Sequence, residues 1–257
     1  DVYRIIEKIN HQLIEELLEK GISRRNLWEY GIIHDWQIKM AYLSIYGSHS
    51  INGVARLHTE ILKNRELNSW YRVYPEKFNN KTNGITQRRW LLLSNPELSK
   101  LITDLLGSDA WITNLDELKK LEKYADDEGI LNRFLDVKYA KKIQLADYIK
   151  EHEGIEIDPN SIFDIQIKRF HEYKRQLLNA FQILDLYFRL KDNPQMDIVP
   201  RTFIFGGKAA PGYFRAKTVI KFINDIADLI NNDEEINGKI KVVFVRNYRV
   251  SYAERMF

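Results

Sequence analysis

Residues 165–175 concentrate the side-chain types that bind anions. They read Ile-Gln-Ile-Lys-Arg-Phe-His-Glu-Tyr-Lys-Arg, and they continue an apolar run that begins at residue 162. At a turn between a strand and a helix, free backbone N–H groups and the helix dipole add to the positive potential of such side chains. A solvated charge run is the plainer alternative, because charged residues are mostly exposed. The position after an apolar strand favours a bound anion.

Two further apolar runs end in segments of the same chemical kind. Residues 201–206 lead into Gly206-Gly207-Lys208, and residues 239–246 lead into Arg246-Asn247-Tyr248-Arg249. Paired glycines let a backbone approach a ligand closely. Gly206-Gly207-Lys208 lacks the spacing of a nucleoside-triphosphate loop, however, and it could be a tight turn alone. Ligands of open parallel sheets bind beyond the carboxyl ends of the strands. We therefore predict one phosphate-binding edge, which contains Lys168, Arg169, Lys174, Lys208, Arg246 and Arg249.

The alternation of apolar runs with helical patterns predicts the elements that hold this edge. We expect strands at 161–167, 201–206 and 239–246, with helices at 172–191 and 212–231 between them. This order predicts the α/β class, with a βαβαβ unit, a parallel sheet and right-handed crossovers. Pro211 is expected as an early helical residue. The expected core stripes are Leu177, Phe181, Leu184 and Phe188 in the first helix, and Val219, Ile220, Ile223, Ile226 and Ile230 in the second.

The residues before about 157 follow a mostly helical pattern. Apolar residues recur at three- and four-residue spacing from Val2, and Gly21 closes this first helix. The pattern changes at Asp158-Pro159-Asn160, where strands begin to alternate with helices. The expected helices are 2–19, 34–46, 51–64, 97–106, 115–124 and 128–151, with an irregular stretch at 66–95.

The composition narrows the class of protein and its compartment. The chain has 257 residues, 44% of them hydrophobic, so a sizeable core is expected, and its net charge of +3 does not favour nucleic acid as a partner. It has no Cys, which excludes disulfides and thiolate sites and fits a reducing compartment. No apolar run approaches the roughly 20 residues of a membrane span. Nothing near His49 or His58 completes a metal set, so no metal site is predicted.

Five segments resemble the α-glucan phosphorylases, the family of the glycogen, starch and maltodextrin phosphorylases. They are GSHSINGVARLHTEILK (47–63), FNNKTNGITQRRWLLLSNPEL (78–98), PNSIFDIQIKRFHEYKRQLLN (159–179), PRTFIFGGKAAPGY (200–213) and VRNYRVSYAE (245–254). The matches are long, occur in the family's order and extend over almost the whole chain. The resemblance implies a two-lobe, glycosyltransferase-B-like architecture. Residues 1–82 would form the mostly helical end of the N-terminal lobe, and residues 83–257 the first βαβαβ half of a Rossmann-like C-terminal lobe.

The same resemblance implies an activity and a cofactor. The family uses inorganic phosphate to cleave the terminal α-1,4-glucosidic bond of a glucan and releases glucose 1-phosphate. It uses the phosphate group of pyridoxal phosphate, rather than its ring, in proton transfer. Two phosphate groups that are brought close together repel, so the site needs several fixed positive charges. The whole protein is expected to be a cytoplasmic homo-oligomer that binds neither nucleic acid nor membrane.

Site residues carry over by position from the family's motifs. Arg169 and Lys174 would hold the substrate phosphate, and Lys168 would hold the cofactor phosphate. His171 belongs to the same motif and is grouped with the catalytic residues, although taken alone it could be a structural hydrogen-bonding residue. The remaining residues are Trp90, Tyr248 and Arg249 around the cofactor, Asn83 at the glucosyl unit, and Tyr213 at the entrance of the cleft.

The chain also departs from the family's pattern. Gln87 stands where the family usually has Pro, and Phe170 where Ile is common. The Gly-Thr-Gly-Asn-Met-Lys segment, whose Lys forms the Schiff base with the cofactor, does not occur in these residues. Both ends interrupt a pattern, so we expect an internal fragment that is inactive alone. The alternatives are a nucleotide-sugar-dependent glycosyltransferase of the same architecture and a phosphate-binding module without catalysis.

The absent motif generates a first prediction. The 257-residue chain should not form a Schiff base with pyridoxal phosphate at one specific lysine, because only scattered surface amines are available to it. Borohydride reduction followed by peptide mapping measures this. Stoichiometric label on a single lysine would contradict the prediction.

Overall fold

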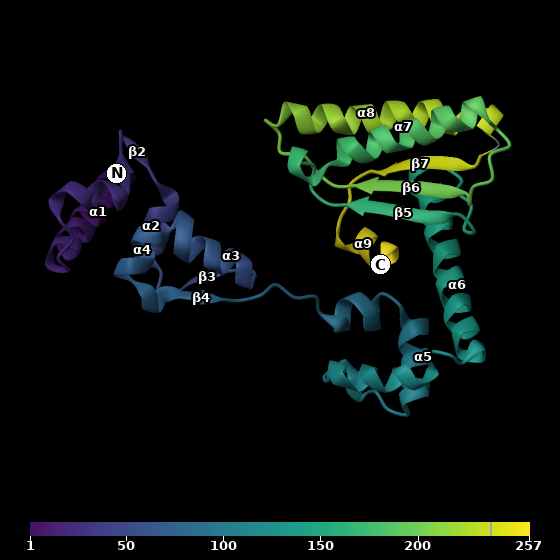
Figure 1. Cartoon of the computed structure of the whole chain (residues 1–257), viewed down its shortest axis with the longest axis horizontal. Helices are drawn as coiled ribbons and strands as arrows, with labels where there is room; N and C mark the ends of the chain where they lie inside the picture. The colour runs from purple at the N-terminus through teal and green to yellow at the C-terminus, as the bar shows by residue number, and fades with distance from the viewer. Residues whose placement is uncertain (237) are drawn as a thin grey trace. The chain divides into compact units, whose positions relative to one another are not determined.

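The computed structural model describes residues 1–236 and 238–257, which form two compact units. The first unit is Asp1–Ile85 and the second is Thr86–Phe257. Each unit has its own hydrophobic core, and each is described by itself (Figure 1). Helices and parallel strands are both present, which confirms the predicted mixed α/β class.

The first unit packs short helices around a buried tryptophan. Trp70 is 1% exposed, and its ring lies edge-on to those of Tyr30 and Tyr42 at centroid distances of 5.6 and 5.3 Å. Leu13 and Leu17 of the first helix complete this core, which explains the apolar spacing in that helix. The elements are α1 (Val2–Glu19), β1 (Ile33–His34), β2 (Gln37–Ile38), α2 (Met40–Gly47), β3 (Ile51–Gly53), α3 (Arg56–Ile61), a π-helical turn (Leu62–Glu66), α4 (Asn68–Val73) and β4 (Phe78–Asn80).

Three predictions for this part of the chain are wrong in detail. The helix expected from residue 34 begins only at Met40, because Asp35 and Trp36 adopt positive φ and turn β1 back on β2. The helix expected from residue 51 begins at Arg56, because residues 51–53 pair in parallel with β4. The stretch expected to be irregular contains α4 and β4. Short strands of two or three residues have too little periodicity to be recognised from sequence.

The second unit begins with helices whose ends are encoded locally. The Asn95 side chain accepts a hydrogen bond from the Leu98 amide at 3.0 Å, and the Asp127 side chain accepts one from the Ile130 amide at 3.1 Å. Both are N-caps. Gly107 and Gly154 end two of these helices in the left-handed conformation. The elements are a π-helix (Arg88–Leu93), α5 (Pro96–Leu106), a 3-10 helix (Leu115–Tyr124) and α6 (Glu128–Glu153).

A parallel three-stranded sheet carries the rest of the second unit. The strands lie in the order β5 (Ile162–Ile167), β6 (Arg201–Gly206) and β7 (Ile240–Val245), and they are in register, so that Ile167, Gly206 and Val245 lie side by side. The connecting helices are α7 (Gln176–Asp192) and α8 (Phe214–Asn231), and α9 (Val250–Met256) follows β7. The predicted strands are confirmed to within one residue at each end.

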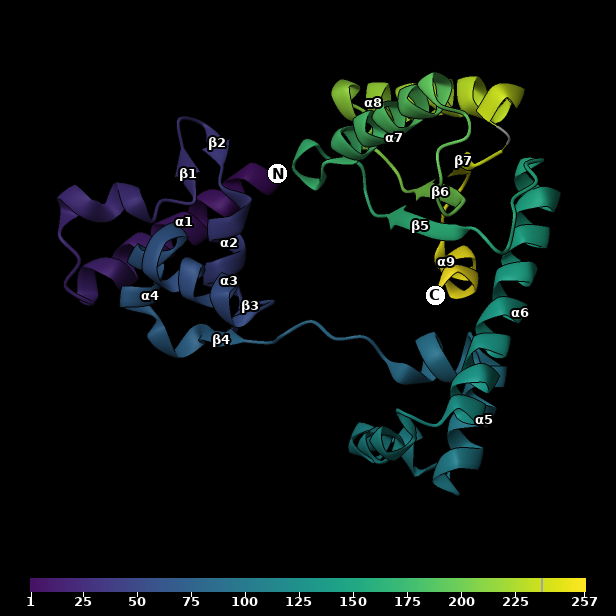
Figure 2. The same ribbon diagram turned by 45° about the vertical axis from the view of Figure 1, so that its right-hand side comes forward.

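Strands β6 and β7 are buried on both faces of this sheet. Phe203, Phe205 and Val242 belong to the core shared with α7 and α8, whereas Ile204 and Val243 pack in a second core with residues of α6 and α9. Figures 1 and 2 show α7 and α8 together on one face and α9 on the other. Burial on both faces explains why β6 and β7 read as nearly continuous apolar runs.

The face that α7 turns inward differs from the predicted stripe at Leu177, Phe181 and Phe188, whereas Leu184 packs against the core as predicted. Phe181 and Phe188 are 53% and 57% exposed, whereas Ala180, Ile183 and Tyr187 are buried. Apolar residues occur on both faces of this helix, so the spacing alone could not select the buried one. The stripe predicted for the second helix is confirmed at Ile223, Ile226 and Ile230, with Val219 and Ile220 packed at its margin.

The starts of these two helices also differ from the predictions. The α-helix expected from residue 172 begins at Gln176, because Arg175 adopts a left-handed conformation with φ 59° after a short 3-10 turn. Pro211 lies in the turn before α8, which begins at Phe214, so it is not a helical residue. Both corrections lengthen the loops at the carboxyl end of the sheet.

In the described residues, no helix is long and apolar enough to cross a membrane. No cluster of three or more His, Cys, Asp or Glu that could hold a metal ion occurs in ranges 1–236 and 238–257.

The packing of α6 on the sheet generates a stability prediction. Ile149 of α6 is fully buried against the sheet. Ile149→Ala should therefore lower the free energy of unfolding by about 2–5 kcal/mol. Ile143, on the same helix and 38% exposed, is the matched control, for which Ile143→Ala should cost less than about 1 kcal/mol. Urea unfolding curves measure both values. Equal losses in the two variants would show that α6 does not dock as described.

Candidate functional site

The first two loops at the carboxyl end of the sheet are joined through their backbones. The Lys168 amide donates to the Gly206 carbonyl, and the Phe170 amide donates to the Lys208 carbonyl, each at 3.0 Å. These bonds continue the pairing of β5 with β6 beyond the strands themselves. The segments expected from sequence to share one edge therefore do lie side by side.

Gly207 makes this approach possible. A Cβ atom on Gly207 would lie 2.1 Å from the Lys168 carbonyl oxygen, and its φ of 149° is one that other residues rarely adopt. Gly206 is also constrained, because a Cβ there would lie 2.7 Å from a methyl group of Val245. The glycine pair thus serves the contact between loops and strands, which is a structural reason for it beside any role in ligand approach.

Two glutamines that the sequence analysis did not single out hold the first loop. Gln166, on β5, donates through Nε2 to the Lys174 carbonyl at 3.1 Å, and its Oε1 accepts from Asn179 at 3.0 Å. Gln176, only 2% exposed, donates through Nε2 to the Arg169 carbonyl at 3.1 Å. A polar residue within the apolar run of β5 was the available signal for Gln166.

Glu172 joins the first loop to the start of α8. The Tyr213 hydroxyl donates to its Oε2 at 2.6 Å and accepts from its backbone amide at 3.2 Å, while Arg215 donates to Oε1 at 3.0 Å. The hydrogen bonds from Tyr213 and then Arg215 hold the pKa of Glu172 below its usual value, and the bond to Glu172 raises the pKa of Tyr213. The His171 ring lies 4.6 Å from that of Tyr173 and 5.1 Å from that of Tyr213.

The third loop reaches the same edge through Tyr248. Its ring atom Cδ2 lies 3.3 Å from the position that a Cβ of Gly206 would occupy, and burial raises the pKa of its hydroxyl. Asn247, with φ 49°, makes the turn after β7. Arg249 lies at the start of α9, and its Nη2 donates to the Tyr148 hydroxyl at 3.4 Å.

Arg246 does not belong to the group of free cations in which the sequence analysis placed it. Its Nε donates to Glu153 Oε2 at 2.8 Å, and its Nη2 donates to the His152 carbonyl at 2.7 Å. The prediction that Arg246 is an unpaired cation of this edge was therefore wrong. The sequence could not reveal the pair, because Glu153 lies 93 residues earlier in the chain and no local pattern connects the two.

The other predicted cations have no acidic partner in the part of the chain that the structure describes. Arg246 and Arg215 each form an ion pair, with Glu153 and Glu172 respectively. The cations at the edge that form none are Lys168, Arg169, Lys174, Lys208 and Arg249, of which Lys174 is half-buried and the others are exposed. Uncompensated positive charge at the ends of parallel strands suits a bound anion.

Two further predicted site residues belong to other parts of the chain. Trp90 lies in the π-helix of the second unit, where its ring packs edge-on against that of Phe257 at 5.2 Å. Asn83 belongs to the first unit, where its backbone amide donates to the Val54 carbonyl at 3.0 Å. The contacts of the edge described above include neither residue.

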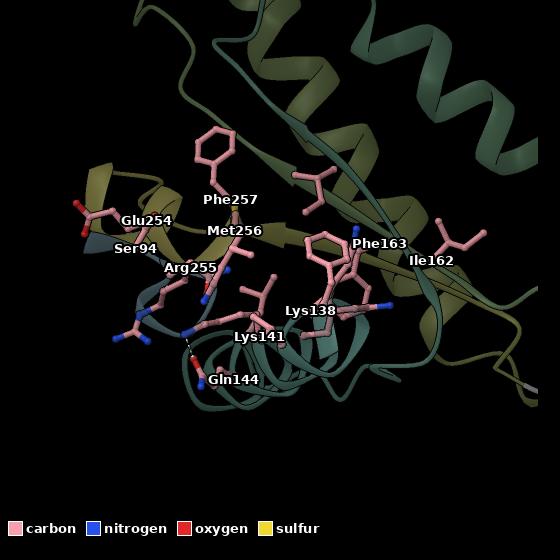
Figure 3. A pocket seen from close by; sticks show the side chains of 17 residues that line it. Ser94, Lys138, Lys141, Gln144, Ile162, Phe163, Glu254, Arg255, Met256 and Phe257 are labelled. Atoms are coloured by element: carbon pink, nitrogen blue, oxygen red, sulfur yellow. Dashed lines mark hydrogen bonds between the residues drawn. The ribbon is translucent and has the colours of Figure 1, made fainter. Parts of the chain in front are cut away.

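A cavity of about 540 Å³ lies elsewhere in the second unit (Figure 3). It borders the earlier part of β5 at Phe163, α6 at Lys138 and Lys141, and the end of the chain at Met256 and Phe257. Lys168, Arg169, Lys174 and Lys208 do not line it. The cavity is therefore distinct from the cationic edge, which follows the last residue of each strand.

The close approach at Gly207 generates a prediction. Gly207→Ala should lower the free energy of unfolding by about 1–3 kcal/mol, because the new methyl group meets the Lys168 carbonyl in a strained backbone conformation. Gly212 is the matched control, since a Cβ there meets nothing within 4 Å. Chemical denaturation measures both. If Gly207→Ala were as stable as Gly212→Ala, the two loops would not be in contact.

Comparison with known proteins identifies the family. The carbohydrate phosphorylase family matches residues 1–257. The chain is 51% identical to a glycogen phosphorylase of Synechocystis sp. and 48% identical to the mouse muscle form, in each case over 98% of the chain and 30% of the relative. It is 46% identical to the Bacillus subtilis glycogen phosphorylase over 100% of the chain and 32% of that relative. The chain spans about a third of the length of these curated relatives, and it belongs to the carbohydrate phosphorylase family.

Proposed function

We propose that this chain is part of an α-glucan phosphorylase and supplies that enzyme's phosphate-binding edge. The reaction transfers a terminal α-1,4-linked glucosyl unit to inorganic phosphate and gives glucose 1-phosphate. The similarity to glycogen phosphorylases over the whole chain supports the proposal. Residues 1–82 are assigned to the end of the N-terminal lobe and 83–257 to the start of the C-terminal lobe, and the two compact units divide close to that boundary.

The observation that carries the proposal is the group of cations without acidic partners at the sheet edge. Phosphorolysis brings a dianionic phosphate to a site that already holds another phosphate group, and the two repel. Fixed cations offset this repulsion in the ground state. They also stabilise the negative charge that develops in the transition state as the glucosyl bond breaks. We assign Arg169 and Lys174 to the substrate phosphate, and we group His171 with them as a catalytic residue.

The residues present fit the phosphate group of pyridoxal phosphate. Lys168 follows the last residue of β5 and has no carboxylate partner in the described residues, so its ammonium group is available to a phosphate. Tyr248 packs against Gly206, since its Cδ2 lies 3.3 Å from the position that a Cβ of this glycine would occupy. When bound, the cofactor supplies a phosphate group that exchanges a proton with the substrate phosphate. We assign Lys168, Tyr248, Arg249 and Trp90 to the cofactor.

The sugar and the cleft involve the remaining assigned residues. We place Asn83 at the glucosyl unit, and Tyr213 at the entrance of the cleft. Two hydrogen bonds between the Tyr213 hydroxyl and Glu172 hold this side chain in place, which favours a role in shaping the entrance. By family resemblance, the whole protein is expected to be a cytoplasmic homo-oligomer.

The decisive assay compares two donors. The protein that contains this chain should form glucose 1-phosphate from an α-1,4-glucan and inorganic phosphate, and should not transfer glucose from a nucleotide sugar. Transfer from a nucleotide sugar without phosphorolysis would identify a glycosyltransferase of the same architecture. Phosphate binding without either reaction would identify a binding module.

Lys174 provides the sharpest test of an assigned role. Lys174→Ala in the whole enzyme should lower phosphorolysis by about 100- to 1,000-fold, because one preorganised contact to a phosphate is lost. Its melting temperature should be nearly unchanged, since the buried face of α7 is formed by Ala180, Ile183 and Tyr187 instead. Lys217→Ala, an exposed lysine near the start of α8, is the matched control. Near-normal turnover in a folded Lys174→Ala enzyme would refute the assignment.

A further inference from the structure

Glu153 is a buried carboxylate in an unfavourable place. It is the last residue of α6, and its side chain is only 4% exposed. The C-terminal end of a helix carries partial negative charge, so a carboxylate there is disfavoured by the helix dipole as well as by burial. Such a residue persists only if its neighbours compensate for both effects.

The third loop provides this compensation. The Arg246 amide donates to Glu153 Oε1 at 3.1 Å, its Nε donates to Oε2 at 2.8 Å, and the Tyr252 hydroxyl lies 3.4 Å from Oε1. Arg246 also donates to the His152 carbonyl at 2.7 Å, which satisfies one of the free carbonyls at the end of α6. One arginine therefore makes three hydrogen bonds to two consecutive residues of the helix.

The same end of α6 restrains the rest of the third loop. Asn247, directly after Arg246, has a φ of 49°, which most residues avoid. Beyond it, Arg249 donates to Tyr148 of α6 at 3.4 Å, and Tyr248 lies against Gly206. Arg246 on one side and Arg249 on the other thus attach the turn to the helix.

We infer that Glu153 is a positioning residue for the candidate site, which acts by fixing the third loop through Arg246. It does not touch the phosphate-binding edge itself. By holding Arg246, it fixes the left-handed turn at Asn247, and with it the place of Tyr248 and Arg249 at the strand ends. This inference rests on the proposed function, because it takes the edge to be an anion site.

Four variants of the 257-residue chain separate this role from a general effect on stability. Glu153→Ala removes both acceptor oxygens, whereas Glu153→Gln keeps one and serves as a conservative rescue. Glu151→Ala is the matched control, because it removes the same charge from the same turn of α6 and its side chain is 77% exposed. Arg246→Lys keeps the charge of the loop but loses the planar group that bonds Glu153 and His152 at once.

Two readouts are measured on each variant. The first is the affinity for inorganic phosphate, by calorimetric titration at one ionic strength. Because the third loop is no longer held at the edge, Glu153→Ala should weaken phosphate binding by about tenfold, with partial recovery in Glu153→Gln. The second is amide hydrogen exchange, which reports local opening. Exchange should quicken at residues 246–249 in Glu153→Ala and Arg246→Lys, while the amides of β6 stay protected.

The outcomes separate the positioning role of Glu153 from the proposed function of the edge. If residues 246–249 exchange as in the Glu151→Ala control, and phosphate binds equally well, Glu153 has no positioning role. If the wild-type chain binds no phosphate but the loop still loosens in Glu153→Ala, the proposed function fails for this edge while the link from Glu153 to the loop stands. Loss of protection throughout β6 in both Glu153→Ala and Glu153→Gln would show that Glu153 acts on the fold as a whole, and would overturn the inference.

Discussion

The contact between the Gly207 backbone and the Lys168 carbonyl is the constraint on which the rest of the candidate site depends. It allows the first two loops to continue the pairing of β5 with β6 beyond the strands. Lys168 in the first loop and Lys208 in the second therefore lie at the same end of the sheet. No side chain fits at that point. The sequence requirement for glycine is therefore set by the distance between two backbones, and the positions of Lys168 and Lys208 follow from it.

The cations at the edge repel one another, and uncharged polar side chains hold the loop that carries most of them. The first loop is held by the amide side chains of Gln166 and Gln176, which bind backbone carbonyls and leave the charge of the loop uncompensated. Two carboxylates near the edge pair with arginines, Glu172 with Arg215 and Glu153 with Arg246. The two glutamines add no negative charge to the loop, and the two glutamates are each paired with an arginine. The positive potential of the remaining cations at the edge is therefore retained.

Long patterns of the sequence predicted the sheet well, whereas contacts between distant residues were out of its reach. The three strands and the cations that follow them could be read from apolar runs and from the residues at their ends. The inward face of α7 could not, since Phe181 and Ile183 are equally apolar and only the packing against the sheet separates them. The pairing of Arg246 with Glu153 could not be read either, because nothing local to either residue indicates the other.

The hydrogen bonds that hold the first and third loops differ greatly in the number of residues between the two bonded partners. The bond from Gln176 to Arg169 spans seven residues, whereas the bond from Arg246 to Glu153 spans 93. Closing the longer span costs about 2 kcal/mol more in chain entropy, if the cost grows with the logarithm of length. The glutamine supports of the first loop thus lie within one continuous stretch of the chain. The third loop is held by α6, so the completed edge depends on contacts that span 93 to 101 residues.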